Sequence, residues 1–288
     1  MEKLLALTLA GLCGTVSAQT PATNLMPDGS HDMYIGLGAV SAPAYEGARE
    51  RRRSALPVLQ MEWSNGIFVS GLSAGMHLSR QPSMEFGPLL AVQRGRSESG
   101  SSRGVGGVDA SSGENTLAPP GTDMETRKVQ AEVGRLSGMN DIDRRLEAGG
   151  FFNYYLTPQL RLTNNLLVGS GKERHGARWN LGVQYIVRPG AHHSLSLAAG
   201  LTLVNRHYNE TYFGVTPEEE MSSGNRAYAP SGGLKDVLLG GRWNFAFAPA
   251  WILTSGLHFT RLQASAKDSP LVERPSNLTV STALAYRF

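Results

Sequence analysis

The last eleven residues of the chain alternate between large apolar and small or polar side chains. Leu278, Val280, Leu284, Tyr286 and Phe288 share one parity, while the other parity carries Thr, Ser, Ala and Arg. A strand places successive side chains on opposite faces, so the segment predicts a strand with one apolar face. A soluble sandwich can end on the same pattern, and one segment therefore does not decide the fold class.

Similar alternation recurs in the second half of the chain, at residues 178–188, 194–203, 235–247 and 251–260. About ten residues is the length that a tilted strand needs to cross a bilayer. No segment shows a convincing helical period. The nearest case, Glu125–Leu136, reads equally well as a strand.

The first half predicts strands near residues 31–41, 54–63, 66–78 and 84–95. With 126–136 as a further strand, the pattern predicts an all-β fold: a transmembrane antiparallel β-barrel of about twelve strands with both termini in the periplasm. In that count the flexible loop 97–123, rich in Gly, Ser and Pro, lies in the periplasm. A ten-stranded count omits 126–136 and one early strand, and moves the loop outside.

The connections between the predicted strands alternate in length. Tight turns at 157–158, 188–191 and 248–250 are interleaved with mostly longer connections at 172–175, 205–233 and 263–277. Outer-membrane barrels keep short turns on the periplasmic side and long loops outside. When the topology is counted back from a descending last strand, the tight turns all fall in the periplasm.

The first eighteen residues have a short charged start, an apolar core and small residues up to Ala18. This pattern predicts a secretory signal peptide at 1–18, followed by the barrel at 19–288. Cys13 is the only cysteine and lies inside the apolar core. We therefore expect no disulfide, zinc-thiolate or cysteine-nucleophile chemistry in the mature chain.

Composition supports a membrane protein that crosses with strands. Apolar residues make up 41% of the chain and the mean hydropathy is −0.22. No long apolar run follows the signal, which excludes a helical membrane protein but not a barrel, because alternating residues average out. The net charge of +3 gives no large nucleic-acid footprint, so no nucleic-acid partner is expected.

Four blocks in fixed order resemble the MipA/OmpV family of outer-membrane proteins. They are Tyr34–Gly47 with Leu56-Pro57, Glu147–Phe151, Tyr208–Val215 continuing to Asp236, and Asp268–Val272 with the terminal Tyr286–Phe288. The motif positions are Gly36, Gly38, Pro43, Tyr45, Glu46, Gly47, Pro57, Tyr208, Tyr212, Phe213, Gly214, Val215, Gly232, Gly233 and Asp236. Tyr286 and Phe288 resemble the sorting signal that the barrel-assembly machinery reads in closing strands.

The resemblance implies an outer-membrane barrel without enzymatic activity or cofactor. The name-giving member is described as binding a lytic murein transglycosylase, and as helping to join it to a bifunctional penicillin-binding protein. The leading interpretation is therefore a scaffold for periplasmic murein hydrolase and synthase complexes. Lipid and lipopolysaccharide of the outer membrane are the other expected partners.

Two alternatives remain open at this point. A small-solute channel would use lumen-facing polar residues, for which the alternation proposes Arg178, Gln184, Arg188, Asp236, Arg242 and Asn244. A surface adhesin or receptor would bind through the loops at Arg49–Arg53 and 205–233. Other members of the family are discussed as adhesins, osmoregulated proteins or antibiotic-response proteins.

Three local motifs allow both a functional and a structural interpretation. Arg49, Arg51, Arg52 and Arg53 are candidates to contact lipopolysaccharide phosphates, which guanidinium matches bidentately, but a solvated charged loop has the same composition. The aromatic residues of Tyr208–Val215 suit an interfacial belt, loop packing or recognition. Gly232-Gly233 suits the start of a strand at the barrel rim.

Candidate catalytic and metal-binding motifs are weak. His192-His-Ser194 has the His-x-Ser spacing of one class of outer-membrane lipid deacylases, but it falls at a periplasmic turn and has no third residue to orient the histidine. Glu218–Glu220 predicts a charged loop rather than a calcium site. The scattered histidines lack metal-ligand spacing.

Overall fold

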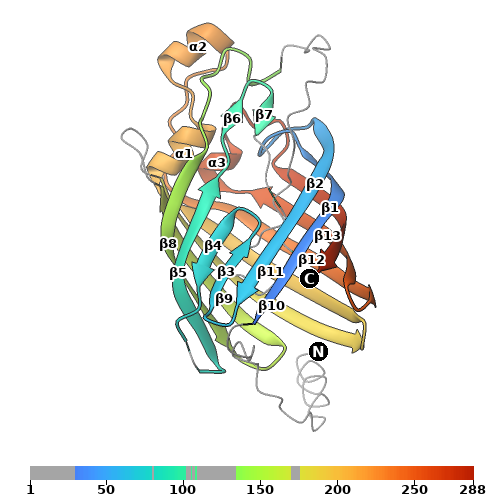
Figure 1. Cartoon of the computed structure of the whole chain (residues 1–288). Coiled ribbons are helices and arrows are strands. Elements are labelled where there is room, and N and C mark those ends of the chain that lie inside the picture. The colour runs from blue at the N-terminus through green and yellow to red at the C-terminus, as the bar shows by residue number, and fades with distance from the viewer. Residues whose placement is uncertain (1–29, 80, 102–104, 106–107, 109–133, 170–175) are drawn as a thin grey trace, which may run out of the picture.

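The fold is a closed antiparallel barrel, shown in Figure 1. The computed structural model describes residues 30–79, 81–101, 105, 108, 134–169 and 176–288. The twelve wall strands are β1 (His31–Pro43), β2 (Arg51–Trp63), β3 (Ile67–Ser70), β4 (Ser73–Met76), β5 (Met84–Gln93), β8 (Arg145–Tyr155), β9 (Leu160–Gly169), β10 (Ala177–Gly190), β11 (His193–Val204), β12 (Gly233–Ala248), β13 (Trp251–Leu262) and β14 (Ser276–Arg287). The predicted fold class and the count of twelve are confirmed. The predicted signal peptide lies outside the described residues.

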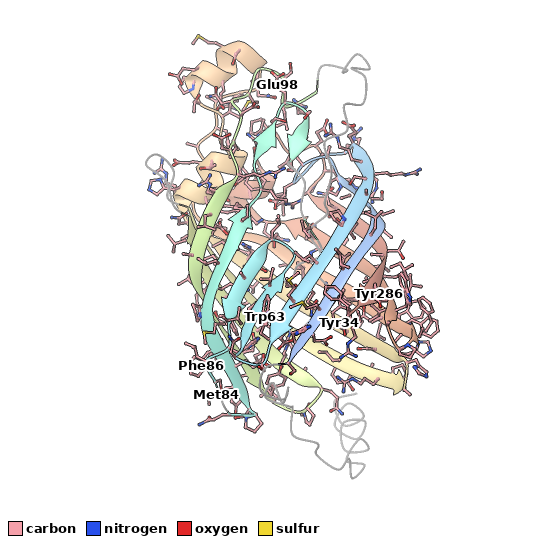
Figure 2. The ribbon with its side chains drawn as sticks, in the orientation of Figure 1. Tyr34, Trp63, Met84, Phe86, Glu98 and Tyr286 are labelled. Atoms are coloured by element: carbon pink, nitrogen blue, oxygen red, sulfur yellow. The ribbon has the colours of Figure 1, made fainter. Side chains whose placement is uncertain are left out.

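The apolar parity of each strand faces outward, as the alternation predicts. Leu37 on β1, Leu257 on β13 and Leu284 on β14 are exposed, whereas their strand neighbours of the other parity face the lumen. This arrangement is typical of a barrel whose outer surface contacts lipid tails. Figure 2 shows outward aromatic residues such as Trp63 and Tyr286 in the half of the barrel opposite Glu98.

The barrel closes between β1 and β14 across a narrow seam of small residues. Gly36 pairs with Ala285, and Gly38 pairs with Ala283. Because these glycines have no side chains, Leu56 and Val58 of β2 pack together with the two alanines of β14 in one buried cluster. Glycine in a strand permits this tight approach of the β14 backbone and alanine side chains. The two family-motif glycines therefore have a structural role.

The wall is shorter at β3 and β4 than the sequence predicts, because each strand has only four residues. The expected single strand at 66–78 is wrong: β3 and β4 form a short hairpin that turns at Gly71, where φ is +58°. The Gly71 amide donates to the Leu59 carbonyl oxygen, which shows that residues 57 and 59 direct their backbone polar groups away from β1. Pro57 lies past the tip of the hairpin, on the edge of β2 that has no neighbouring strand. Because proline has no N–H, it leaves no unpaired backbone donor on this edge.

The predicted strand at 126–136 is not part of the wall. Residues 126–133 lie outside the described residues, and 134–138 form a turn. The extra wall strand comes instead from the β3–β4 hairpin, so the count of twelve stands. The segment between β5 and β8 consequently begins and ends at the external end, while most of the predicted periplasmic loop 97–123 lies outside the described residues. Its described part forms the two-stranded sheet of β6 (Arg96–Ser97) and β7 (Gly100–Ser101).

The two ends of the barrel differ as the connection lengths predict. Short turns at 64–66, 156–159, 191–192 and 249–250 lie at the periplasmic end. The longer connections lie at the other end together with three helices, α1 (Arg206–Phe213), α2 (Pro217–Ser223) and α3 (Ala264–Lys267), in Figure 1. The residue pattern did not predict these helices. No described helix is long and apolar enough to cross a membrane.

The described lumen is occupied by side chains near the periplasmic end. Arg161 is 1% exposed, its Nη1 lies 3.4 Å from Glu85 Oε2, and its Nε donates to Gln184 Oε1 at 2.6 Å. Tyr155 donates to Glu85 Oε1 at 2.7 Å. These groups join strands β5, β8, β9 and β10 across the inner face.

Elsewhere in the lumen, Val108 of the β5–β8 connection packs against Leu56 and Val58. Its amide donates to Gln60 Oε1 at 2.7 Å, and its carbonyl oxygen accepts from Asn244 Nδ2 at 3.2 Å. The contacts therefore tie β2 and β12 together through a residue inside the barrel.

Candidate functional site: the external cap

Parts of three family blocks, which are far apart in sequence, meet at the external end of the barrel. We call this assembly the external cap. It consists of the β1–β2 loop at 44–50, the described parts of the β5–β8 connection, helices α1 and α2, the start of β12 and the β13–β14 loop at 263–275. The cluster at its centre contains Ala44, Tyr45, Ala48, Leu136, Met139, Val215 and Leu271.

The β1–β2 loop docks on the β13–β14 loop. The carbonyl oxygen of Gly47 accepts from the amides of Glu273 and Arg274, both at 2.9 Å. Tyr45 is buried, and its hydroxyl donates to the Leu271 carbonyl oxygen at 3.0 Å. Burial, with the nearby Glu273 carboxylate, raises the pKa of Tyr45 well above its usual range, so the phenol keeps its proton.

Helix α1 places the aromatic residues of its block inside the cap. The Asn205 side chain caps the helix by accepting from the Tyr208 amide at 2.9 Å. Tyr208 is buried and accepts from Gln93 Nε2 at 3.0 Å, while Phe213 packs against Leu262 and Ala266. These contacts correspond to loop packing, one of the interpretations open from the sequence.

A bulge at the start of β12 turns Lys235 into the barrel. Successive β12 partners of β11 jump from Asp236 to Leu234, so Lys235 is the additional residue. Its Nζ lies 2.9 Å from Asp236 Oδ2 and 3.0 Å from Glu46 Oε2. The motif residues Glu46 and Asp236 thus share one buried ammonium, which links the β1–β2 loop to the wall. The strand predicted to start at Gly232-Gly233 is confirmed, with β12 beginning at Gly233.

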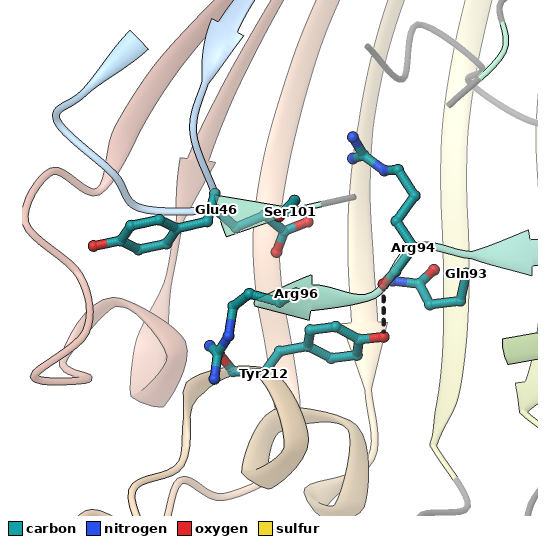
Figure 3. Close-up of a pocket in the computed structure, with 7 residues that line it drawn as sticks. Glu46, Gln93, Arg94, Arg96, Ser101 and Tyr212 are labelled. Carbon is teal, nitrogen blue, oxygen red and sulfur yellow. Dashed lines mark hydrogen bonds between the residues drawn. The ribbon is translucent and has the colours of Figure 1, made fainter. Parts of the chain in front are cut away.

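A small pocket lies within the cap, where Figure 3 shows its lining. The lining residues are Tyr45, Glu46, Gln93, Arg94, Arg96, Ser101 and Tyr212. The Tyr212 hydroxyl donates to the Arg94 carbonyl oxygen at 3.2 Å, and Arg96 donates to the Tyr212 carbonyl oxygen. The two arginine side chains point away from each other in Figure 3, so they do not form a shared anion site.

Gly47 offers a direct test of cap docking. Its φ of +95° disfavours any side chain, and a Cβ here would lie 2.8 Å from Val272 Cγ2. We expect Gly47→Ala to lower the free energy of unfolding by about 1–3 kcal/mol and to expose the external loops to protease. The matched control is Gly224→Ala, because Gly224 also has positive φ but no atom within 4 Å of the added Cβ. Equal protease resistance of the two variants would contradict the docking.

The four candidate arginines occupy different positions. Only Arg49 lies in the loop, and its backbone amide donates to Glu273 Oε2 at 3.0 Å. Arg51, Arg52 and Arg53 open β2, so the predicted single basic loop is wrong in its geometry. Arg51 and Arg53 share the outward parity of β2, whereas Arg52 shares the lumen-facing parity of Leu56 and Val58.

The residues of the candidate His-x-Ser motif at 192–194 make structural contacts. His193 stacks on Phe245 with ring centroids 4.6 Å apart, and its Nδ1 accepts from Trp243 Nε1 at 3.3 Å. It belongs to the outward aromatic group at the periplasmic end. His192 is exposed at the turn, and Ser194 lies on the opposite parity from His193. The predicted lack of enzymatic activity stays a prediction.

The acidic run forms the first turn of α2. Thr216 and Glu219 form a reciprocal capping box, in which the Glu219 amide donates to Thr216 Oγ1 at 3.2 Å. Glu219 Oε1 also accepts from the Asn140 amide. Across the part of the chain that the structure describes, no group of three or more His, Cys, Asp or Glu side chains forms a candidate metal site.

Most of the six residues proposed to line a channel make contacts with other lumen residues. Arg178 Nε donates to Glu147 Oε2 at 2.7 Å, and Gln184 Nε2 donates to Ser196 Oγ at 2.7 Å. Asp236 pairs with Lys235, while Asn244 bonds Val108 and Thr254. Arg242 is buried, and Arg188 is exposed near the periplasmic end of β10.

The closed antiparallel wall, its apolar outer face and its polar, side-chain-filled interior define an outer-membrane β-barrel. The family model described as "MltA-interacting protein MipA" matches residues 35–288. The chain belongs to this family.

The chain is also similar to individual members over a shorter region. The MltA-interacting protein of Escherichia coli (strain K12) is 31% identical over 90 residues, which cover 31% of this chain and 36% of that protein. Outer membrane protein Omp26La of Vibrio anguillarum is 31% identical over 90 residues, covering 31% of this chain and 34% of that protein. These matches therefore span about a third of the relatives' length.

Among solved structures, the chain is similar to the NanC porin, with a TM-score of 0.40 and 8% identity over 90% of this chain and 100% of that one. A bacterial polysaccharide outer membrane secretin gives a TM-score of 0.44 and 9% identity, covering 91% of this chain and 100% of that one.

Proposed function

We propose that this barrel is a non-enzymatic anchor that holds a lytic murein transglycosylase at the periplasmic surface of the outer membrane. The observation that carries the proposal is membership of the MipA family over residues 35–288. The relative from Escherichia coli is named for interaction with MltA. A bifunctional penicillin-binding protein is the second proposed partner, joined through the same complex.

The interior of the barrel favours an anchor over a pore. Arg161 is bonded to both Glu85 and Gln184 near the periplasmic end, and Val108 joins β2 to β12 from inside the lumen. The external cap adds a further layer of packed residues above them. Side chains that satisfy one another in this way leave few polar groups to conduct a hydrated solute.

Capture from detergent extracts tests the anchor. The folded mature protein, immobilised through a tag, is expected to retain a lytic transglycosylase from a periplasmic extract. A heat-unfolded sample of the same protein serves as the control and should retain none. If the folded protein captures no transglycosylase while its gel mobility still shows an intact barrel, the anchor proposal is wrong.

Planar-bilayer recording tests the alternative of a channel. We expect the folded protein to insert without stepwise conductance, because the lumen is occupied. The matched comparison is Gln60→Ala combined with Asn244→Ala, which removes both side-chain bonds to Val108. Regular conductance steps from the wild-type protein would favour the channel.

A further inference from the structure

The outward face of β2 changes from apolar to basic near the external end. Pro57 and Leu59 face outward and pair with the exposed Leu37 and Ile35 of β1. The next outward positions above Ala55 are Arg53 and Arg51. Both arginines therefore stand on the outer surface of the wall, directly above the apolar band.

The outward face of β13 changes at the same level. Leu257 and Phe259 are exposed apolar residues, and Arg261 follows on the same parity as an exposed residue. In the pairing with β14, Phe259 is opposite Leu278, and Arg261 is opposite Ser276. The arginine is therefore one step above the apolar band on this strand as well.

Arg51 brings the two positions together. Its Nη1 donates to the Leu278 carbonyl oxygen at 2.6 Å, and its Nη2 donates to the Ser41 carbonyl oxygen at 2.9 Å. The guanidinium thus reaches across β1 to β14, the strand next to β13. Leu278 is paired with Phe259 of β13, and Arg261 is the next outward residue of β13 toward the external end.

This patch has a net positive charge. Among the described residues, no carboxylate lies within the 4 Å distance of an ion pair from Arg51, Arg53 or Arg261. The nearby Glu50 approaches Arg52 instead, and Glu273 accepts from the Arg49 amide. Uncompensated guanidinium groups at the lipid boundary attract anions, and their fork geometry matches phosphate.

We propose that Arg51, Arg53 and Arg261 form a binding site on the outer face of the barrel for the phosphate groups of lipopolysaccharide. The site lies at the external end, where phosphate-bearing headgroups of the outer leaflet meet the wall. The lipid tails then cover Pro57, Leu37 and Phe259 below it. This site is independent of the periplasmic anchor.

The test compares matched variants of the full mature barrel in detergent. Binding of purified lipopolysaccharide is measured for the wild type, for R51Q/R53Q/R261Q and for R52Q, which carries the same change on the opposite face of β2. We expect the triple variant to lose roughly tenfold or more in affinity and R52Q to bind as the wild type does. Single R53Q changes a side chain that makes no hydrogen bond or ion pair among the described residues, so it keeps the test valid if the triple variant fails to fold.

The chemistry of the ligand is tested with three further probes. The first probe is lipopolysaccharide without its phosphates. Its affinity for the wild type should be as low as the affinity of intact lipopolysaccharide for the triple variant. Inorganic phosphate at millimolar concentration should not displace the lipid, since displacement would indicate a site for soluble anions and overturn the proposal. Unchanged affinity of both the triple variant and R53Q, or an equal loss in R52Q, would also overturn it.

Discussion

Replacing Gly38 by alanine is expected to lower the free energy of unfolding by about 1–3 kcal/mol, and replacing it by valine should prevent closure of the barrel. An added Cβ would fall within the contact distance of the Thr282 carbonyl oxygen and of the Ala283 side chain. That carbonyl belongs to the β1–β14 ladder, which joins the first strand to the last. Urea titration of protein folded into phospholipid vesicles, followed by tryptophan fluorescence, measures the effect.

Gly240→Ala is the matched control for this prediction. Gly240 also lies inside the barrel, but a Cβ there meets its nearest atom, His258 Nδ1, at 3.6 Å. We expect a change within about 0.5 kcal/mol, which separates crowding from the general effect of a methyl group on a strand. If Gly38→Ala is as stable as Gly240→Ala, the seam between β1 and β14 is not packed as described.

Replacing Arg161 by methionine is expected to destabilise the barrel by about 3–5 kcal/mol. The substitution keeps apolar volume but leaves the Glu85 carboxylate without its cation and Gln184 without its donor. A buried charge that loses its partner is strongly unfavourable, because water does not replace the lost contact. The midpoint of urea unfolding in vesicles gives the measurement.

The double variant Arg161→Met/Glu85→Gln distinguishes loss of the ion pair from loss of packing. Removing both charges leaves no uncompensated carboxylate, so we expect it to recover part of the stability lost in Arg161→Met. Additive losses from the two substitutions would show that the two side chains do not interact across the lumen.

The strand alternation predicted most of the wall and its apolar outer face. It correctly separated the apolar residues of 251–260 and 278–288 from the small residues of β14 on the opposite face. It failed at 66–78 because the hairpin turn depends on the positive φ of Gly71, a backbone feature that alternation does not report. It also missed α2, although Thr216 and Glu219 have the spacing of a capping box.

The external cap could not be predicted from local pattern. Its contacts join residues that are far apart in the chain, such as Tyr45 with Leu271 and Glu46 with Lys235. Strict alternation would place Lys235 outward beside Val237, and only the bulge opposite Leu203 turns it inward. The family blocks named most of these residues in advance, but their mutual contacts come from tertiary packing.

The central claim is that the barrel presents its periplasmic end to a murein enzyme. Photo-reactive residues at the exposed positions Gln81, Arg188 and His192 sample that end, and Met221 and Arg226 sample the external end. Irradiation of intact cells is expected to join a lytic murein transglycosylase to the first set and not to the second. Crosslinks to the transglycosylase from Met221 or Arg226 alone, or none from the three periplasmic positions in cells that contain the folded barrel, would contradict the claim.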